Sequence, residues 1–297
     1  MGESEAHVRL STFHSSPPTI LATFAHPDDE AFGSGGTFAR YAAAGSRVVL
    51  VCATRGEVGE ISDAALATPE TLGDVREGEL RCAAAALGIS EVILLGYRDS
   101  GMVGTADNAD ERAYVNAPSD EVVHRLTGVI RAERPSVIVT FDPTGAYGHP
   151  DHIAIHHHSV AALRAAADEA FAPELGPSWQ AARLAYVALP RSAFRQMRDA
   201  LAAQGDDVTM FERFEEAGVG SEDDELHIRI DVSAHVDAKN RAFECHRTQF
   251  GGDSLFERVP AELMRQIMSQ EYFTLGWPAR TSGDEQAPLL DGLLAGL

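Results

Sequence analysis

Residues 19–30 read TILATFAHPDDE and join a short apolar run to a cluster of polar side chains. The first half is partly β-branched or aromatic, as expected of a strand that is buried on both faces of a parallel sheet. The second half places His26, Asp28, Asp29 and Glu30 directly after that strand. Because open α/β sheets bind ligands at the carboxyl ends of their strands, this stretch predicts a parallel sheet with a ligand site at its edge.

These polar side chains have two interpretations. A histidine beside several carboxylates needs positive charge to offset theirs, and a divalent metal ion supplies it. Pro27 fixes its own φ angle and keeps the turn between His26 and Asp29 rigid. The alternative is an ordinary helix N-terminus, in which Asp28 caps the helix and Asp29 is a first-turn acid favoured by the helix dipole. The place of His26 at the strand end, together with a second His/Asp cluster later in the chain, favours the metal.

Strand and helix patterns alternate along the chain. Strands are expected at residues 20–24, 47–53, 91–95, 137–141 and 183–189, and helices at residues 75–87, 120–133, 153–167 and 191–204. This alternation predicts an α/β fold, with a Rossmann-like and mostly parallel sheet and helices on both of its faces. The patterns are weaker after residue 205. The C-terminal α+β extension is expected to have strands at residues 226–231 and 271–275 and helices at residues 233–245 and 260–268.

The expected organisation is a single domain over residues 1–297, with its core at about residues 19–205. Residues 206–297 form the extension, and residues 1–18, which end in SSPP, are expected to be a loose leader. No apolar run approaches the length of a transmembrane helix, and the start of the chain lacks the basic and apolar regions of a secretory signal. A cytoplasmic location is therefore expected.

Charge and cysteine content narrow the possible partners. The formal net charge of -21 argues against nucleic acid and anionic membranes as partners. The chain has three cysteines, Cys52, Cys82 and Cys245, which are widely spaced and form no CxxC pair. They are expected to be free thiols in a reducing cytoplasm. Homo-oligomers are compatible with the sequence.

A second polar cluster follows the fourth expected strand, in the segment DPTGAYGHPDH at residues 142–152. Two histidines and one carboxylate with an open coordination position are a recurrent catalytic zinc set. His26 and Asp29 are three residues apart, so one turn can point both inward, and His152 completes the expected set of metal ligands. Asp28 is then left over beside a ligand, which suits a general base.

Two further residues are expected at the same sheet edge. Glu57 follows the second strand and either reaches the site or is an exposed loop acid. Arg76 is expected in the first turn of a helix, where a cation opposes the helix dipole, so it should face an anionic group or a polar substrate.

Two other patterns are weaker. His156 follows His152 by four residues, the spacing of some zinc ligand pairs, but is expected to lie on a solvated or packed helix face. The run GSGG at residues 33–36 is not GxGxxG and has no basic residue nearby. It is expected to let a helix start pack closely against a strand rather than to bind a dinucleotide.

Two motifs, AHPDDE at residues 25–30 and GHPDH at residues 148–152, resemble those of the PIG-L/LmbE-type zinc deacetylases. The resemblance extends to three further segments that match the family in order and spacing: TRGEVGE (residues 54–60), REGEL (76–80) and YRDSGM (97–102). The segment AFECHRTQ (242–249), near the C-terminus, matches more weakly. The resemblance covers roughly residues 20–167 and implies a Rossmann-like sheet and hydrolysis of an N-acetyl group, usually on a glucosamine unit. YRDSGM favours the branch that deacetylates small thiol precursors.

The resemblance also implies roles for single residues. It places Zn²⁺ on His26, Asp29 and His152, and makes Asp28 the general base. Another divalent ion such as Fe²⁺ is compatible, because this N,O ligand set is not selective by itself. His149 is implied to stabilise the oxyanion or to protonate the leaving amine; the alternative is a histidine that only packs the GHPDH turn.

The remaining implied roles concern the substrate. Tyr147 matches a mobile tyrosine that polarises the amide carbonyl, and Arg76 and Asp99 match sugar-contacting positions. Met102 and Glu57 are also expected to bind the substrate. Asp151 is expected to lie behind the site, because it matches a position from which a carboxylate can orient a histidine.

The sequence thus predicts a metal-dependent hydrolase that removes an N-acetyl group from a small molecule containing N-acetylglucosamine, with Asp28 as general base for the attacking water. One alternative is an amidase of thiol conjugates on the same scaffold. The other is a non-catalytic nucleotide-binding module, which would leave both His/Asp clusters unexplained.

Overall fold

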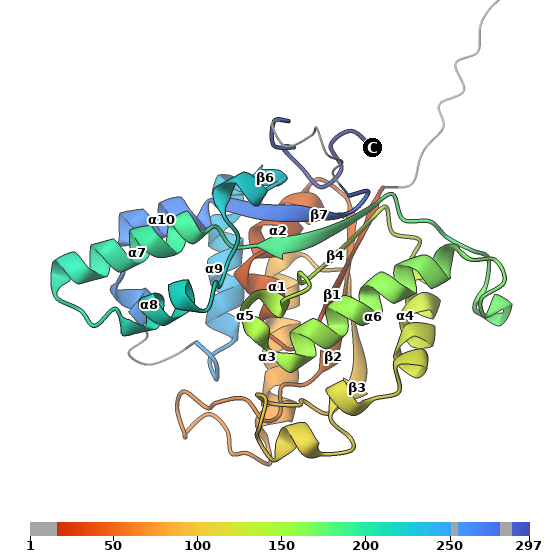
Figure 1. The fold of residues 1–297 in the computed structure, drawn as a ribbon, viewed down its shortest axis with the longest axis horizontal. Helices are drawn as coiled ribbons and strands as arrows, with labels where there is room; N and C mark the ends of the chain where they lie inside the picture. The colour runs from red at the N-terminus through yellow and green to blue at the C-terminus, as the bar shows by residue number, and fades with distance from the viewer. Residues whose placement is uncertain (1–16, 251–254, 280–286) are drawn as a thin grey trace, which may run out of the picture.

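One seven-stranded sheet runs through the computed structural model, which describes residues 17–250, 255–279 and 287–297 (Figure 1). The strand order is β3-β2-β1-β4-β5-β7-β6. The first five strands in this order are parallel, and β7 is antiparallel to both of its neighbours. The strands are β1 (Thr19–Phe24), β2 (Arg47–Thr54), β3 (Glu91–Tyr97), β4 (Val137–Thr140), β5 (Arg183–Ala188), β6 (Ile228–Asp231) and β7 (Gln270–Trp277). The predicted mostly parallel α/β sheet is confirmed.

The centre of the sheet is apolar on both faces. Ile20 of β1 pairs in register with Val48 of β2 on one side and with Val137 of β4 on the other. All three side chains are completely buried. Helices on both faces exclude water from these strands, which explains their continuous apolar runs.

Helices cover the two faces of the sheet in two groups (Figure 1). The pair α4 and α6 packs on one face, and α2, α3 and α9 pack together on the other. The helices are α1 (Asp29–Phe32), α2 (Gly35–Ala43), α3 (Leu72–Leu87), α4 (Ser119–Glu133), α5 (Gly145–Gly148), α6 (Pro150–Ala167), α7 (Arg191–Gln204), α8 (Thr209–Glu216), α9 (Val236–Cys245) and α10 (Ala261–Met268). Among the described residues, no helix is both long and apolar enough to cross a membrane.

The order of the strands defines where a ligand can bind. From β1 the chain adds β2 and then β3 on one side, and afterwards adds β4 and β5 on the other side of β1. Strand order therefore reverses between β1 and β4, and open α/β sheets bind ligands at such a reversal, outside the carboxyl ends of the strands. Both predicted polar clusters follow these two strands.

Helices α3 and α6 begin earlier than expected, and the earlier start of α3 removes the helix-dipole argument for Arg76. Helix α3 begins at Leu72, so Arg76 lies in its second turn and not in its first. The helix-dipole argument for that arginine was therefore wrong. Helix α6 begins at Pro150, directly after His149, whose Nδ1 accepts a hydrogen bond of 3.1 Å from the amide of Asp151. A side-chain cap followed by proline explains why the helix starts there.

The part of the chain after residue 205 extends the same sheet. Strand β7 pairs with β5, and β6 pairs with β7. Helix α9 returns to pack on α2 and α3, close to the first strands of the chain. Helix α8, which the sequence did not predict, packs with α7 and α10 around a small separate core that contains Met197, Leu201, Phe211 and Val259.

The glycines of the GSGG run permit close packing, as expected. A Cβ on Gly33 would lie 2.2 Å from Cγ1 of Val187 in β5, and one on Gly36 would lie 2.7 Å from Cβ of Val232. Contacts this short are not tolerated by real side chains, so neither position accepts a larger residue without movement.

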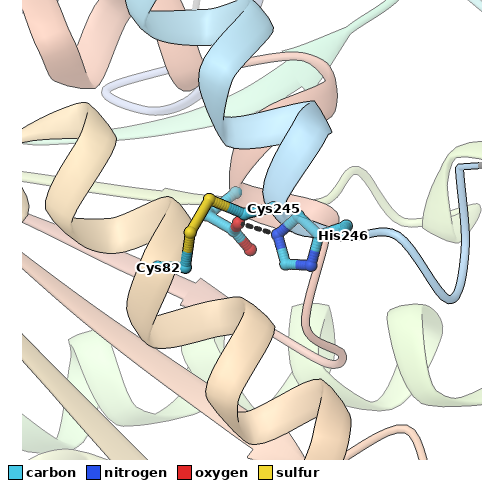
Figure 2. The surroundings of a disulfide bond; sticks show 4 residues. Cys82, Cys245 and His246 are labelled. Carbon is cyan, nitrogen blue, oxygen red and sulfur yellow. Dashed lines mark hydrogen bonds and ion pairs between the residues drawn. A yellow bond between two sulfur atoms is a disulfide. The ribbon is translucent and has the colours of Figure 1, made fainter. Parts of the chain in front are cut away.

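Two of the three cysteines are joined, so the prediction of free thiols was wrong for them (Figure 2). Cys82 of α3 and Cys245 of α9 form a disulfide across 163 residues of sequence, with their Cα atoms 5.7 Å apart. Sequence spacing could not show this, because the pairing depends on α3 and α9 packing side by side. Cys52 is a free, buried thiol, as expected.

Candidate active site

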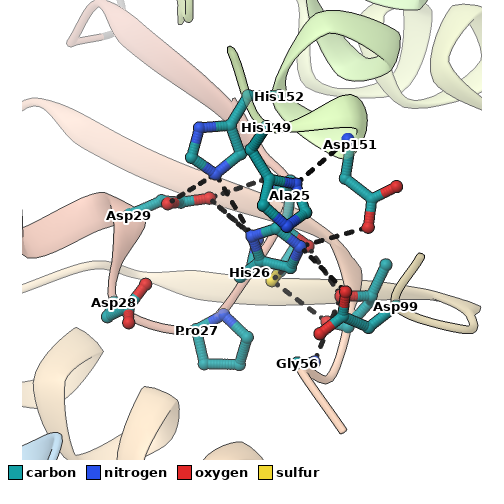
Figure 3. Close-up of polar contacts among 12 residues, drawn as sticks. Ala25, His26, Pro27, Asp28, Asp29, Gly56, Asp99, His149, Asp151 and His152 are labelled. Atoms are coloured by element: carbon teal, nitrogen blue, oxygen red, sulfur yellow. Dashed lines mark hydrogen bonds and ion pairs between the residues drawn. The ribbon is translucent and has the colours of Figure 1, made fainter. Parts of the chain in front are cut away.

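The two predicted clusters meet at the carboxyl ends of β1 and β4 (Figure 3). The loop between β1 and α1 supplies His26 and Asp28, the first residue of α1 is Asp29, and the start of α6 supplies His152. The loop after β3 adds Asp99, whose Oδ1 lies 3.5 Å from Nε2 of His26. Residues far apart in sequence thus form one group of buried histidines and carboxylates.

Hydrogen bonds behind the two histidines fix which ring nitrogens face each other. Nδ1 of His152 lies 3.2 Å from the carbonyl oxygen of Gly145, which only accepts, so Nδ1 carries the proton. Nε2 of His26 lies 3.1 Å from Oδ2 of Asp151 and donates to it. The remaining nitrogens, Nδ1 of His26 and Nε2 of His152, are 3.2 Å apart. Two lone pairs at this separation repel each other unless a cation or a proton offsets them, so the site fits a metal ion.

The carboxylate of Asp29 faces both of these nitrogens. Its Oδ1 lies 3.3 Å from Nε2 of His152 and its Oδ2 lies 3.8 Å from Nδ1 of His26. Oδ2 also accepts hydrogen bonds from the amides of Ala25 and His26, which hold the carboxylate in place. Burial alone would raise the pKa of Asp29, but His152 and His26 lower it far below its usual range. This carboxylate therefore stays ionised beside the two imidazoles.

Two overlapping groups of residues could hold a metal ion. The ligand atoms of His26, His149 and His152 all lie within 4.8 Å of one another, and so do those of His26, Asp99 and Asp151. His26 belongs to both groups. Burial opposes a charge on His26, but the carboxylates around it raise its pKa well above the usual value. A group this rich in buried carboxylates attracts a cation.

Asp28 lies apart from the histidines (Figure 3). Its Oδ2 accepts a hydrogen bond of 3.1 Å from Nη2 of Arg76, and its side chain makes no helix-capping bond. Asp28 and Asp29 thus occupy the cap and first-turn positions of the helix-cap alternative, but the Asp28 side chain does not cap the helix. Burial raises the pKa of Asp28 to about 6, and Arg76 opposes that rise. Its side chain is 20% exposed against 8% for Asp29, so it has more access to a substrate.

The guanidinium group of Arg76 forms hydrogen bonds with other residues of the chain. Its Nη1 donates to the carbonyl oxygen of Gly56, and its Nη2 donates to the carbonyl oxygen of Pro27 and to Asp28. The residue is only 3% exposed. The expectation that it faces an anionic group agrees with its ion pair to Asp28, whereas its contact with a substrate stays a prediction.

His149 and Tyr147 lie beside His26 and His152; His149 is buried and Tyr147 is exposed. The ring of His149 is 4.6 Å from that of His26, centroid to centroid, and the ring of Tyr147 is 5.1 Å from that of His152. Burial lowers the pKa of His149 to about 4, with the nearby His26 and His152 adding to the effect. Burial also raises the pKa of Tyr147, so it keeps its hydroxyl proton, and half of the residue is exposed.

Asp151 and Asp99 support the site from behind. Besides His26, Oδ2 of Asp151 accepts a hydrogen bond of 3.0 Å from the amide of Ser100, and the residue is completely buried. Oδ1 of Asp99 accepts from the amide of Gly101. Burial would raise the pKa of Asp99, but His26 lowers it far below its usual range. Both carboxylates therefore hold His26 in the orientation described above.

Glu57 and Met102 are not brought into this group by any hydrogen bond or ion pair among the described residues. Glu57 accepts from the amide of Arg55 and lines a polar cavity of about 820 Å³ beside β2 and β3, with Arg98 and Arg112 on its wall. Met102 is 47% exposed. Their roles in substrate binding stay predictions.

Two neighbouring histidines of α6, His156 and His158, pack into the protein, as expected for His156, whereas His157 is exposed. Its Nδ1 lies 2.9 Å from the carbonyl oxygen of Phe141, and the residue is 5% exposed. His158 shares a hydrogen bond of 2.8 Å with the hydroxyl of Tyr114. Neither histidine belongs to a group of described residues that could hold a metal.

Two residues next to the site were not among the predicted ones. Glu30 and His246 are completely buried, and their side chains meet 2.6 Å apart behind the AHPDDE loop. Both residues lie in segments that resemble the family: Glu30 ends the AHPDDE motif, and His246 lies in AFECHRTQ, the weaker match. Sequence alone could not join them, because the contact spans 216 residues.

Comparison with known sequences identifies a family. A family model described as PIG-L, GlcNAc-PI de-N-acetylase, matches residues 21–163. The 1D-myo-inositol 2-acetamido-2-deoxy-alpha-D-glucopyranoside deacetylase of Geodermatophilus obscurus is 38% identical over 289 residues, a match that covers 94% of this chain and 97% of that one.

Solved structures show the same fold at lower identity. N,N'-diacetylchitobiose deacetylase from Pyrococcus horikoshii superposes with a TM-score of 0.62 at 22% identity, covering 87% of this chain and 83% of that chain. GalB, the 4-carboxy-2-hydroxymuconate hydratase from Pseudomonas putida KT2440, gives a TM-score of 0.60 at 20% identity, covering 89% of this chain and 98% of that chain. Since these two proteins are named for different reactions, the shared fold does not by itself define the chemistry.

Proposed function

This chain belongs to the PIG-L family of de-N-acetylases, and we propose that it hydrolyses the acetamido group of 1D-myo-inositol 2-acetamido-2-deoxy-α-D-glucopyranoside or of a close analogue. One observation carries the chemistry: Nδ1 of His26 and Nε2 of His152 turn their lone pairs toward each other at 3.2 Å beside the carboxylate of Asp29. The substrate class comes from the relative, which is 38% identical along nearly its whole length.

The proposed metal ligands are His26, Asp29 and His152, and Zn²⁺ is the proposed ion. Two imidazoles and one carboxylate with an open position are typical of catalytic zinc. When bound there, a divalent cation supplies a Lewis acid for the amide carbonyl and lowers the pKa of water. The chain's own contribution is orientation, because Asp151 and the carbonyl oxygen of Gly145 hold the two rings with their lone pairs inward.

Asp28 is the proposed general base. Its carboxylate lies next to the ligands without contacting their ring nitrogens and is partly exposed, so it can reach a water molecule beside the amide carbon. Asp28 takes a proton from this water as the oxygen attacks the carbonyl carbon. The same proton is then given to the amide nitrogen as the carbon–nitrogen bond breaks, and the products are acetate and the free amine.

His149 is the proposed hydrogen-bond donor to the oxyanion. Its Nδ1 accepts from the amide of Asp151, so in the neutral ring the proton is on Nε2. A neutral ring with Nε2–H can donate a hydrogen bond to a developing negative charge without first losing a proton. Tyr147, protonated and half exposed, is proposed as a second donor to the carbonyl oxygen.

Substrate contacts are proposed for the remaining predicted residues. Asp99 lies 3.5 Å from His26 and is close enough to the reacting centre to accept a hydrogen bond from a sugar hydroxyl. Met102 is exposed after β3 on the same edge of the sheet. Glu57 borders a polar cavity that suits a polyol, and Arg76 is proposed to act chiefly through Asp28.

The test is hydrolysis of a panel of amides by purified, zinc-loaded protein, followed as release of the free amine from every compound and of acetate from the N-acetyl compounds. The panel contains the glucosaminyl-inositol substrate, free N-acetylglucosamine and a thiol-conjugate amide. We expect the first compound to have the highest kcat/KM. Preference for the thiol conjugate would favour the amidase alternative, and binding of nucleotide without hydrolysis of any amide would favour the nucleotide-binding module. The cytoplasmic location is likewise proposed and is tested by cell fractionation.

A further inference from the structure

The C-terminal part of the chain reaches the AHPDDE loop through one buried contact. His246 follows α9 as its C-cap residue and is completely buried. Its Nε2 lies 2.6 Å from Oε1 of Glu30, which is also completely buried. Because a carboxylate oxygen only accepts, Nε2 of His246 donates this hydrogen bond. In the part of the chain that the structure describes, Nδ1 of His246 has no partner, so Glu30 receives the only hydrogen bond of this ring.

The second oxygen of Glu30 holds the backbone of Asp28. Oε2 accepts a hydrogen bond of 3.0 Å from the amide of Asp28. Asp28 has φ 113 and ψ -25, a conformation that is unfavourable for a residue with a Cβ. Such a conformation persists only where the surroundings impose it, and it occurs most often at functional sites. The carboxylate of Glu30 is one of the groups that impose it here.

We propose that Glu30 and His246 form a positioning pair for Asp28. His246 fixes the carboxylate of Glu30, and Glu30 fixes the amide of Asp28 in the left-handed region, which aims the Asp28 side chain at the water to be activated. The inference rests on the proposed function in one respect, because it takes Asp28 to be the general base. Neither residue of the pair touches the substrate.

His246 is itself anchored to α3 on both sides. The preceding residue, Cys245, is joined to Cys82 by the disulfide (Figure 2). Two residues later, the amide and Oγ1 of Thr248 donate hydrogen bonds of 2.8 and 2.6 Å to the two oxygens of Glu79. The same helix supplies the arginine that binds the carboxylate of the general base. One helix therefore supports both the side chain and, through the positioning pair, the backbone of that residue.

Hydrogen exchange tests the inference without reference to activity. The amide of Asp28 donates into a buried carboxylate, so we expect it to exchange slowly in the wild-type protein. In His246→Ala and in Glu30→Ala, exchange at this amide should be at least ~10-fold faster. His158→Asn is the matched control, because it changes another buried histidine, whose hydrogen bond goes to Tyr114. Exchange at Asp28 should not change in the control.

Kinetics distinguishes positioning from a general structural role. His246→Ala and Glu30→Ala should lower kcat by roughly 10- to 100-fold, the usual effect of a misplaced catalytic group, with KM within about twofold. Bound metal per chain should stay the same. His246→Gln keeps a donor of similar reach and should recover most of kcat. In the Asp28→Asn background, His246→Ala should cause no further loss, because the pair acts through Asp28.

Several results would overturn the inference. One is an equal loss of kcat on His246→Ala with and without Asp28→Asn. Another is unchanged exchange at the amide of Asp28, and a third is loss of metal from His246→Ala. If the wild-type protein releases acetate from no compound of the panel, the proposed function fails, and the exchange measurement still decides whether the pair positions Asp28.

Discussion

Nη2 of Arg76 lies 3.1 Å from Oδ2 of Asp28 and 2.6 Å from the carbonyl oxygen of Pro27. This arginine therefore binds both the backbone and the side chain of the AHPDDE loop from helix α3. At 3% exposure its charge is almost fully desolvated, and removing one partner of such a pair leaves the other charge uncompensated. The guanidinium is thus part of what holds the loop in its functional shape.

Replacement of Arg76 should reduce turnover more than substrate affinity. Arg76→Ala is expected to lower kcat by roughly 10- to 100-fold, because Asp28 loses the donor that fixes its carboxylate. Arg76→Lys keeps the charge but cannot make the same forked set of hydrogen bonds, so it should recover only part of kcat. Steady-state kinetics and metal analysis check this prediction. Unchanged kcat in Arg76→Ala, or loss of metal from it, would contradict the assignment.

Metal content should depend on the two facing histidines and not on the next one along α6. His26→Ala and His152→Ala should strip the metal, because each removes a lone pair from the proposed site. His156→Ala should retain about one ion per chain, since the Nδ1 of His156 faces the carbonyl oxygen of Phe141. Elemental analysis of the purified variants measures this. Loss of metal from His156→Ala with retention in His152→Ala would show that the ligand set is wrong.

The sequence was most informative where a local pattern fixes the structure. Apolar runs predicted the first five strands, because a strand between two layers of helices must be apolar on both faces. The two motifs after β1 and β4 predicted that His26 and His152 come together, because parallel strands end at one edge of the sheet. The start of α3 was missed by three residues, since Gly73 and the polar residues before it give no clear cap.

Long-range partners could not be read from the sequence. The Cys82–Cys245 disulfide depends on how α3 packs on α9, and no spacing rule contains that information. The same holds for Glu30, which looks like a first-turn acid but meets His246 from the far end of the chain. Helix α8 was missed because its eight residues carry only a short amphipathic pattern.

The disulfide should make a measurable contribution to stability. Cross-linking residues 163 positions apart restricts the unfolded chain, and Cys82→Ser should lower the free energy of unfolding by about 2–5 kcal/mol. Reductant should lower the stability of the wild-type protein by a similar amount and leave the variant unchanged. Denaturant unfolding with and without reductant measures both effects. Cys52→Ser is the control, because Cys52 is a free thiol whose stability effect does not depend on reductant.

Acid should destabilise the protein in part through His158. Burial lowers the pKa of His158 to about 4, with a small contribution from His157. The unfolded chain takes up a proton at this residue near pH 6.5, whereas the folded chain does so only near pH 4. Its contribution to the free energy of unfolding is therefore fully present above about pH 6.5. This contribution, about 2–3 kcal/mol, is lost as the pH falls toward 4. His158→Asn should flatten unfolding free energy against pH in this window, and an unchanged slope would contradict the assignment.

Asp28 and Asp29 are neighbours of the same type with different surroundings, and their asparagine variants should fail in different ways. Asp29 faces Nε2 of His152 at 3.3 Å, whereas Asp28 faces Arg76. Asp28→Asn keeps the shape of the side chain but cannot accept a proton near neutral pH. It should retain metal and stay folded while kcat falls by roughly two to four orders of magnitude, the range of a general base. Its stability should fall, because the buried charge of Arg76 loses its partner.

Asp29→Asn should instead weaken metal binding, because it removes the negative charge that offsets the cation. Part of its activity should return when excess metal is added, which Asp28→Asn should not show. Metal titration followed by activity measurement separates the two variants. Exchanged outcomes, with Asp28→Asn losing the metal and Asp29→Asn keeping it, would reverse the assignment of ligand and base. Full activity in both variants would remove the case for a hydrolytic metal site at the carboxyl ends of β1 and β4.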